Sequence, residues 1–284
     1  MSKRCDQGGD VVGSTKTEPQ PTANTQTGAD TPSSLRVLSL GAGVQSTTLA
    51  LMVAAEELEP LDCAIFADTQ AEPSATYRHL EWLMSSGLLP FPVHIVTAGN
   101  LASDLIDPPK SGFKSYTMTL PAHQPPTGMA RRYCTSNYKT QPITKKLNAL
   151  RKRQKVELWL GISTDEASRM KPASEPWLTR RYPLIERGFS RMDCRSWLFK
   201  RGYRQPPKSS CVFCPYRDER SWRDMNRDAP GDWQLACRVD DAIRANYQID
   251  AYVHRSMKPL RDVTLFVGAQ PDLFGNECEG YCGV

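Results

Sequence analysis

Two cysteines on one short turn are the residues of this chain best suited to chemistry. They read Cys211-Val-Phe-Cys214 and are followed by Pro215. Two thiolates at this spacing suit a tetrahedral zinc ion and an iron–sulfur cluster alike, and a proline directly after the second cysteine is familiar in iron–sulfur ligation. We therefore expect a metal centre here, whose further ligands must come from elsewhere in the chain.

The other cysteines supply candidates for those ligands. The chain has nine cysteines, an odd number, which favours metal or redox chemistry in the cytoplasm over a disulfide framework. Cys134 is the leading third ligand, because it lies in a basic segment near the expected active site. For a fourth ligand we rank Cys282 first, then Cys278 and Cys194. A 4Fe–4S cluster is expected ahead of a structural zinc ion, and unligated thiols are a third alternative.

A glycine-rich loop between an apolar strand and an apolar helix is the second candidate site. Gly41 and Gly43 stand just before the hydroxyl residues Ser46, Thr47 and Thr48. Glycines let the backbone approach a phosphate, and the free N–H groups at a helix N-terminus attract an anion. The loop therefore predicts a nucleotide or another phosphoryl compound. It is not a Walker loop, because no Gly-Lys-Ser/Thr follows.

Positive charge is concentrated in two segments, although the net charge is only +5. Residues 131–155 hold nine Lys and Arg and no acid, and residues 169–204 hold ten against three acids. Such blocks indicate a polyanionic partner, either a nucleic acid or a small substrate rich in phosphate or sulfate. Solvated helix faces are the alternative for either block alone.

Alternating apolar strands and helices must position these residues. Strands are expected at 37–40, 63–67, 93–96 and 156–162, and helices at 47–57, 74–86 and 142–152. This alternation predicts βαβ units and a parallel sheet. Ligands of such sheets bind at the carboxyl edge, where Gly41–Ser46, Asp68 and Gly161 fall. Beyond residue 180 we expect only short helices, at 194–201, 219–227 and 233–246.

This organisation suggests three parts. Residues 1–34 have almost no large apolar side chain and are expected to be a disordered tail. Residues 35–180 form the predicted nucleotide-binding α/β domain, and residues 181–284 a helical region with the Cys-x-x-Cys motif and a cysteine-containing tail. The mean hydropathy is −0.50, and no apolar run reaches the length of a membrane span. We expect no membrane association and a cytoplasmic location.

Four segments, in order along the chain, resemble motifs of the adenine-nucleotide α-hydrolase (PP-loop ATP pyrophosphatase) superfamily. Residues 41–46 (GAGVQS) are similar to its Ser-Gly-Gly-x-Asp-Ser loop, and residues 66–73 (FADTQAEP) to its Asp-Thr-Gly motif. Residues 161–169 (GISTDEASR) are similar to Gly-Ile-Arg-x-x-Glu-Ser-x-x-Arg, and residues 182–185 (YPLI) with Asp193 to a Pro-Leu…Asp-Val segment. The branch that this chain resembles is the phosphoadenosine-phosphosulfate-reductase-like family. Residues 132–139 and 211–215 resemble its DNA-phosphorothioation and phage or prophage members.

The resemblance implies a Rossmann-like (HUP-type) fold that binds ATP and Mg²⁺. It places the nucleotide on Ser39, Gly41, Gly43, Gln45, Ser46, Thr47, Asp68 and Gly161. Gln45 stands where the superfamily has an aspartate that helps to hold magnesium. Lys139 and Arg169, or Arg132, would neutralise phosphate oxygens as catalytic residues.

The first hypothesis is therefore an ATP pyrophosphatase that adenylates and thiolates a nucleic acid or nucleotide, with an iron–sulfur centre and a sulfur-donor protein. A reductase of phosphoadenosine phosphosulfate or adenylyl sulfate is the second. The third, from another class, is a non-catalytic nucleic-acid-binding module stapled by zinc.

Overall fold

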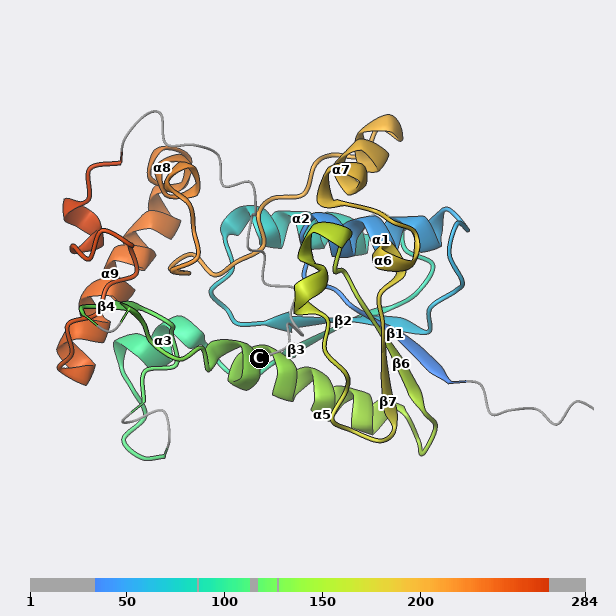
Figure 1. Ribbon diagram of the computed structural model, residues 1–284, viewed down its shortest axis with the longest axis horizontal. Coiled ribbons are helices and arrows are strands. Elements are labelled where there is room, and N and C mark those ends of the chain that lie inside the picture. The colour runs from blue at the N-terminus through green and yellow to red at the C-terminus, as the bar shows by residue number, and fades with distance from the viewer. Residues whose placement is uncertain (1–33, 86, 113–116, 127, 266–284) are drawn as a thin grey trace, which may run out of the picture. The chain divides into compact units, whose positions relative to one another are not determined.

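The computed structural model describes residues 34–85, 87–112, 117–126 and 128–265 (Figure 1). The described residues belong to one compact unit. The predicted N-terminal tail, up to residue 33, lies outside the described residues, as do Cys278 and Cys282.

A five-stranded parallel sheet is the centre of the fold. Its strand order is β3-β2-β1-β6-β7, and every pair in it is parallel. The α/β fold class predicted from the sequence is confirmed. The strands are β1 (Leu35–Ser39), β2 (Cys63–Asp68), β3 (Val93–Thr97), β6 (Val156–Leu160) and β7 (Leu178–Arg181).

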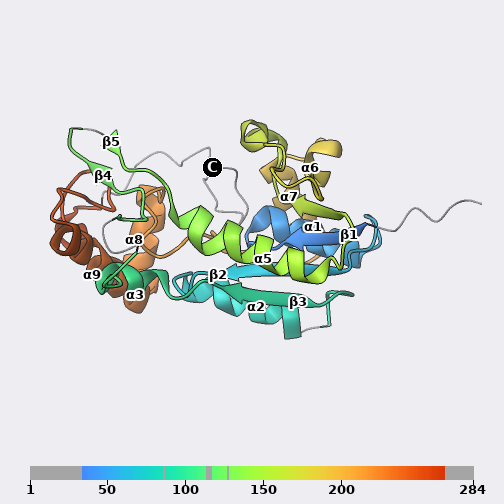
Figure 2. The ribbon, with the colours of Figure 1, turned by 90° about the horizontal axis from the view of Figure 1, so that it is seen from below.

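Helices cover both faces of the sheet. α1 (Val44–Ala54) and α2 (Ser74–Ser85) lie on one face, and α5 (Gln141–Leu150) lies on the other (Figures 1 and 2). The strand order explains this arrangement, because the chain runs from β1 outward to β3 and then returns to β6 on the far side of β1. Right-handed crossovers in opposite directions place their helices on opposite faces.

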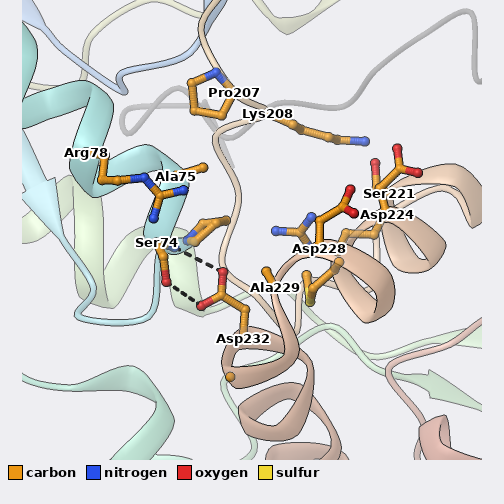
Figure 3. A pocket seen from close by; sticks show the side chains of 14 residues that line it. Ser74, Ala75, Arg78, Pro207, Lys208, Ser221, Asp224, Asp228, Ala229 and Asp232 are labelled. Atoms are coloured by element: carbon orange, nitrogen blue, oxygen red, sulfur yellow. Dashed lines mark hydrogen bonds between the residues drawn. The ribbon is translucent and has the colours of Figure 1, made fainter.

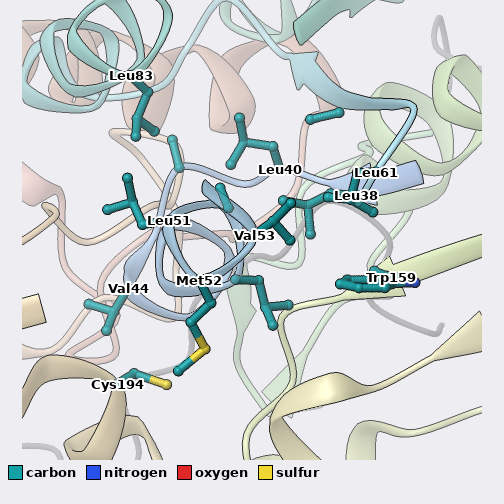
Figure 4. Packing of buried hydrophobic residues seen from close by; sticks show 14 of the residues in the cluster. Leu38, Leu40, Val44, Leu51, Met52, Val53, Leu61, Leu83, Trp159 and Cys194 are labelled. Atoms are coloured by element: carbon teal, nitrogen blue, oxygen red, sulfur yellow. The ribbon is translucent and has the colours of Figure 1, made fainter. Parts of the chain in front are cut away.

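Each face of the sheet has its own apolar cluster. On the α1 face, Leu38 of β1 and Leu40 just after it pack with Leu51 and Met52 of α1 and with Trp159 (Figure 4). On the α5 face, the helix contributes Ile143 and Leu147, both fully buried. Burial of side chains of this size stabilises a fold by about 1.5–3 kcal/mol each. The predicted inward face of α5 is thus confirmed for Ile143 and Leu147, and Leu150 is half-buried.

A third apolar cluster lies away from the sheet. It joins α3 (Leu101–Ile106), α8 (Glu219–Asp228) and α9 (Pro230–Tyr247) to residues 118–122 and 212–213. The cluster therefore mixes residues from both sides of the boundary predicted at residue 180, and the domain division stays a prediction. The remaining elements are β4 (His123–Gln124), β5 (Gly128–Met129), η1 (Ser136–Thr140), η2 (Thr164–Arg169), α6 (Pro183–Glu186), α7 (Arg191–Lys200) and η3 (Leu260–Asp262).

The structure departs from the expected elements at several places, and α7 and α9, like α1, begin three residues earlier than expected. α1 begins three residues earlier than expected, because Gly43 takes the extended N-cap conformation (φ −90°, ψ −175°) directly after the strand. The short strand β7 and the short helix α3 were not expected. Among the described helices, none is long and apolar enough to cross a membrane.

Candidate functional site

The strand order reverses between the two central strands, β1 and β6, at the carboxyl edge of the sheet. β1 and β6 are neighbours, with Ser39 aligned to Leu160, but their following connections lead to opposite sides. Such a point, where the strand order reverses, is where open α/β sheets bind ligands. The glycine loop that begins at Gly41 and the segment that begins at Gly161 both leave the sheet there. The fold thus brings the two predicted nucleotide-binding segments together.

The glycine loop is tightly folded and buried. Ala42 has a left-handed backbone (φ 56°), a conformation that glycine adopts at lower cost. The N–H of Gly41 donates to the hydroxyl of Ser46 (3.2 Å), so the loop closes on its own helix. All residues from Gly41 to Ala50 are buried. A nucleotide that enters this loop must replace contacts that the protein now makes with itself.

Gln45 connects the loop to two other segments. Its amide nitrogen donates to the hydroxyl of Ser163 (3.3 Å) and to a carboxylate oxygen of Glu166 (2.9 Å). Its amide oxygen accepts from Arg191 of α7 (3.3 Å). Glu166 in turn forms an ion pair with Arg169, one of the two predicted catalytic residues. An aspartate at position 45 could not donate to Glu166, so glutamine is matched to this carboxylate.

Thr47 has a buried histidine as its partner. Its hydroxyl lies 3.0 Å from Nε2 of His79 on α2. His79 is 3% exposed, and burial, with a smaller effect of Arg204, lowers its pKa from 6.5 to about 4. The imidazole is therefore neutral at physiological pH. It fixes the position of the Thr47 hydroxyl in the first turn of α1.

Asp68 organises the connection after β2. Its Oδ1 accepts hydrogen bonds from the hydroxyl of Tyr77 (2.8 Å) and from the N–H of Gln70 (2.7 Å). Burial and the hydrogen bond to Asp68 raise the pKa of Tyr77, so this tyrosine stays protonated and keeps donating. Asp68 thus holds the loop that leads to Glu72 and α2.

A buried ion pair joins that loop to the segment before α5. Nζ of Lys139, on η1, lies 2.8 Å from Oε1 of Glu72, and both side chains are at most 5% exposed. The second carboxylate oxygen of Glu72 is buried and accepts no hydrogen bond within the described residues. A buried charge pair with an unused acceptor is unfavourable for stability alone. Such arrangements are typical of sites that act on a ligand or a proton.

Three of the predicted metal ligands line one small cavity. Cys134, Cys211 and Cys214 come from distant segments and share a cavity of about 20 Å³ with Thr69 and Lys139. The thiol of Cys211 lies 3.3 Å from the Thr69 hydroxyl and 3.9 Å from Oε1 of Glu72. The N–H of Cys214 donates to the carbonyl of Cys211 (3.0 Å), which closes the turn.

The surroundings of Cys211 favour its protonated form. Burial is the largest cause and raises the pKa of this thiol, and the charge of Glu72 adds to the effect. Lys139 and Thr69 act in the opposite direction. Burial also raises the pKa values of Cys63 and Cys237 to about 11. Those two cysteines pack in apolar clusters, as expected of residues without a role at the site.

The side chains that line the cavity are of the type that binds metal, but they are not arranged as the ligands of a metal centre. Three thiols facing one cavity are suitable ligands for zinc or an iron–sulfur cluster. Yet within the described residues no three His, Cys, Asp or Glu side chains are grouped closely enough to hold a metal ion. A cavity of about 20 Å³ has room for roughly one water molecule. A four-iron cluster would require the lining side chains to move apart.

One hydrogen bond links the cysteine turn to the glycine loop. The hydroxyl of Ser209, two residues before Cys211, donates to the carbonyl of Gly41. The N–H of Val212 donates to the carbonyl of Ala71 (2.9 Å), just before Glu72. The cysteine turn is thus anchored at both the nucleotide loop and the loop after β2.

The predicted residues therefore fall into two linked groups. Around the glycine loop lie Ser39, Gly41, Gly43, Gln45, Ser46, Thr47, Gly161 and Arg169, and around the cavity lie Cys134, Lys139, Cys211 and Cys214. Asp68 stands at the end of β2, bonded to Tyr77 and Gln70, and does not line the cavity. Cys282 lies outside the described residues, and Cys194 is buried within the apolar cluster on the α1 face. The sequence did not single out Glu72, His79, Glu166, Arg191 and Ser209. Glu72 and Glu166 stand within the quoted motifs, which was the available signal for them.

Comparisons with known proteins add little detail. No family model and no curated protein matches this chain. Among solved structures, the chain is similar to the phosphate complex of phosphoadenylyl-sulfate (PAPS) reductase from Candida auris. The sequence identity is 10% and the TM-score 0.40, over 63% of this chain and 78% of that chain. The assignment of the fold rests on the strand order of the chain itself.

Proposed function

We propose that this chain is a PP-loop ATP pyrophosphatase that adenylates, and then thiolates, a nucleic acid or nucleotide. One observation carries the proposal. Cys134, Cys211 and Cys214 line one cavity with Lys139, and a hydrogen bond from Ser209 joins their turn to the glycine loop at the point where the strand order reverses. A phosphate-binding loop and a set of thiols beside it are the two parts that ATP-dependent sulfur transfer needs.

The reaction would proceed in two displacements. A carbonyl oxygen of the acceptor attacks the α-phosphorus of ATP, the bond to the β-phosphate breaks, and pyrophosphate leaves. A sulfur nucleophile then attacks the activated carbon, and AMP leaves with the former carbonyl oxygen. The backbone N–H groups after Gly41 would hold the departing pyrophosphate. Lys139 and Arg169 would neutralise phosphate oxygens once a ligand separates them from Glu72 and Glu166.

A metal centre on Cys134, Cys211 and Cys214 belongs to the proposal. An iron–sulfur cluster with three protein ligands would supply a coordination site for sulfide or persulfide sulfur, whereas zinc would serve as a staple. Magnesium would accompany ATP, as the resemblance implies.

The basic face of α5 supports a polyanionic acceptor. Ile143 and Leu147 of α5 point inward, Lys145 of this helix is exposed, and so are Lys152 and Arg153 just after its end. A surface of this kind binds nucleic acid through phosphates, so affinity should fall with salt by a log–log slope of about −0.9 per phosphate contacted on duplex DNA. Short DNA and RNA duplexes measured across a salt series test this part. Absence of binding at low salt would favour the alternative reading as a sulfonucleotide reductase.

The metal is tested on anaerobically purified protein. Serine substitutions at Cys134, Cys211 and Cys214 should each remove metal, whereas Cys63→Ser and Cys237→Ser, in apolar clusters, should keep it. Absorbance near 400 nm would identify an iron–sulfur centre. A colourless protein with stoichiometric zinc would favour the non-catalytic module, and full metal content in Cys134→Ser would refute the shared site.

The nucleotide site is tested with Gly43→Val. A side chain at the N-cap of α1 should block the close approach of a phosphate and abolish ATP binding, with an unchanged circular dichroism spectrum. Unaltered ATP affinity in this variant would refute the assignment of the loop.

A further inference from the structure

A pocket behind the cysteine turn is lined by residues that the proposed reaction does not use. It has a volume of about 440 Å³ and lies between the N-terminus of α2, the segment around Lys208, and helices α8 and α9 (Figure 3). Its charged lining consists of three cations and three carboxylates: Arg78, Lys208, Arg217, Asp224, Asp228 and Asp232.

The three carboxylates are all engaged by other groups. Asp232 accepts from the N–H and the hydroxyl of Ser74 (3.0 and 2.7 Å), as Figure 3 shows. Asp228 and Asp224 both form ion pairs with Arg227 (2.6 and 3.2 Å), which does not line the pocket. The negative charges of Asp224 and Asp228 are therefore largely compensated from outside the pocket, whereas Asp232 is bonded to the neutral Ser74 and keeps its charge.

Arg217 is buried and has only neutral hydrogen-bond partners. It is 8% exposed, and its guanidinium donates to the carbonyls of Ser210 (2.7 Å) and Cys211 (3.2 Å). Burial lowers the pKa of Arg217, but a guanidinium remains protonated in proteins. Glu72 and Asp232 attract this charge, but within the described residues no carboxylate forms an ion pair with Arg217. An anion in the pocket would supply one.

The other two cations are also available to a ligand. Arg78 is exposed at the start of α2 and, within the described part of the chain, has no carboxylate at ion-pairing distance. Lys208 has only a long ion pair with Asp218 (3.6 Å). Arg78 and Lys208 extend from different segments that border the pocket (Figure 3).

We propose that this pocket binds a phosphate group. Two guanidinium groups and an ammonium group from three segments match the several oxygens of a phosphate better than a single carboxylate, because each arginine can donate two parallel hydrogen bonds. The volume exceeds that of phosphate alone, so the group can belong to a nucleotide or to the backbone of a nucleic-acid strand. This site does not depend on the reaction proposed for the glycine loop.

Binding of inorganic phosphate, measured by calorimetry in the Gly43→Val background, tests the site, since this variant removes phosphate binding at the glycine loop. We expect Arg78→Ala and Lys208→Ala each to weaken binding about tenfold. Asp228→Asn should strengthen it, because the pocket then loses a negative charge. Arg238→Ala is the matched control, because this arginine of α9 is exposed and does not line the pocket.

The outcomes separate the site from a general surface effect. Equal losses in Arg78→Ala and Arg238→Ala, or unchanged affinity in the double variant Arg78→Ala/Lys208→Ala, would overturn the proposal. The same variants measured with a short single-stranded oligonucleotide identify the source of the phosphate. A parallel loss for oligonucleotide and phosphate assigns the pocket to a nucleic-acid strand, and a loss for phosphate alone assigns it to a free phosphate compound. Intact ATP binding in Gly43→Val would refute only the proposed function.

Discussion

The buried pair of Glu72 and Lys139 allows a quantitative test of the site. Replacing Lys139 by Met keeps the length of the side chain and removes its charge, which leaves Glu72 at 1% exposure without its cation. Removing one partner of a buried ion pair costs about 3–5 kcal/mol. For a domain of this size, 1 kcal/mol corresponds to about 2–4 °C. We therefore expect Lys139→Met to lower the melting temperature by about 6–20 °C.

The double variant separates the charge from the shape of the site. Glu72→Leu/Lys139→Met removes both charges and should be markedly more stable than either single variant, because an apolar pair in a buried position is often neutral or stabilising. Arg220→Met is the control, since its ion pair with Asp224 is 70% and 39% exposed and should contribute at most about 1 kcal/mol. Urea and thermal unfolding, followed by circular dichroism, measure all four proteins. If Lys139→Met is no less stable than Arg220→Met, the ion pair is not buried as described.

Three further predictions concern the glycine loop. Ala42→Gly should stabilise the fold by about 0.5–1 kcal/mol in urea unfolding, because glycine adopts φ 56° without strain, whereas Ala50→Gly within α1 should destabilise it. The free energy of unfolding of the wild type should fall by up to about 3 kcal/mol between pH 6.5 and pH 4, because the pKa of His79 is about 4 in the folded protein and the unfolded chain binds the proton more tightly. His79→Gln should remove this pH dependence. If the stability of His79→Gln falls between pH 6.5 and 4 as much as that of the wild type, the imidazole is not buried as described. Gln45→Glu should lower the melting temperature more at pH 8 than at pH 5, because the new carboxylate would face Glu166 and repel it once both are ionised. An equal decrease in melting temperature at the two pH values would exclude this repulsion.

The central sheet could be predicted from the sequence because its first strands are continuous apolar runs that end at glycine or aspartate. β7 was not predicted, since its four residues, LTRR, carry two arginines and become a strand only beside β6. The third apolar cluster, away from the sheet, was also not predicted, because α3 and α9 meet across a long stretch of sequence. Helical periodicity reports the inward face of a helix but not the element that it contacts.

Only part of the candidate site could be predicted, because sequence patterns report local spacing and not contacts between distant segments. Local spacing identified the glycine loop and the pair Cys211 and Cys214. The partners that fix their geometry are distant: Glu72 lies 67 residues before Lys139, and Ser209 lies 168 residues after Gly41. No local pattern carries that information, since these contacts form only when the strand ends meet at one edge. Gln45 is the clearest example, because its hydrogen bond to Glu166 can be recognised only in the three-dimensional structure.

The hydrogen bond from Ser209 to the carbonyl of Gly41 has a thermodynamic consequence. Only one residue separates Ser209 from Cys211, so a displacement of Gly41 is transmitted to the thiols through a short and buried stretch of backbone. When two binding sites are connected in this way, a ligand at either site can change the affinity of the other site. If occupation of the loop changes the affinity of the thiols for their ligand by some factor, occupation of the thiols changes the affinity of the loop by the same factor. The protein with one ligand bound would then bind the second ligand with an affinity different from that of the empty protein.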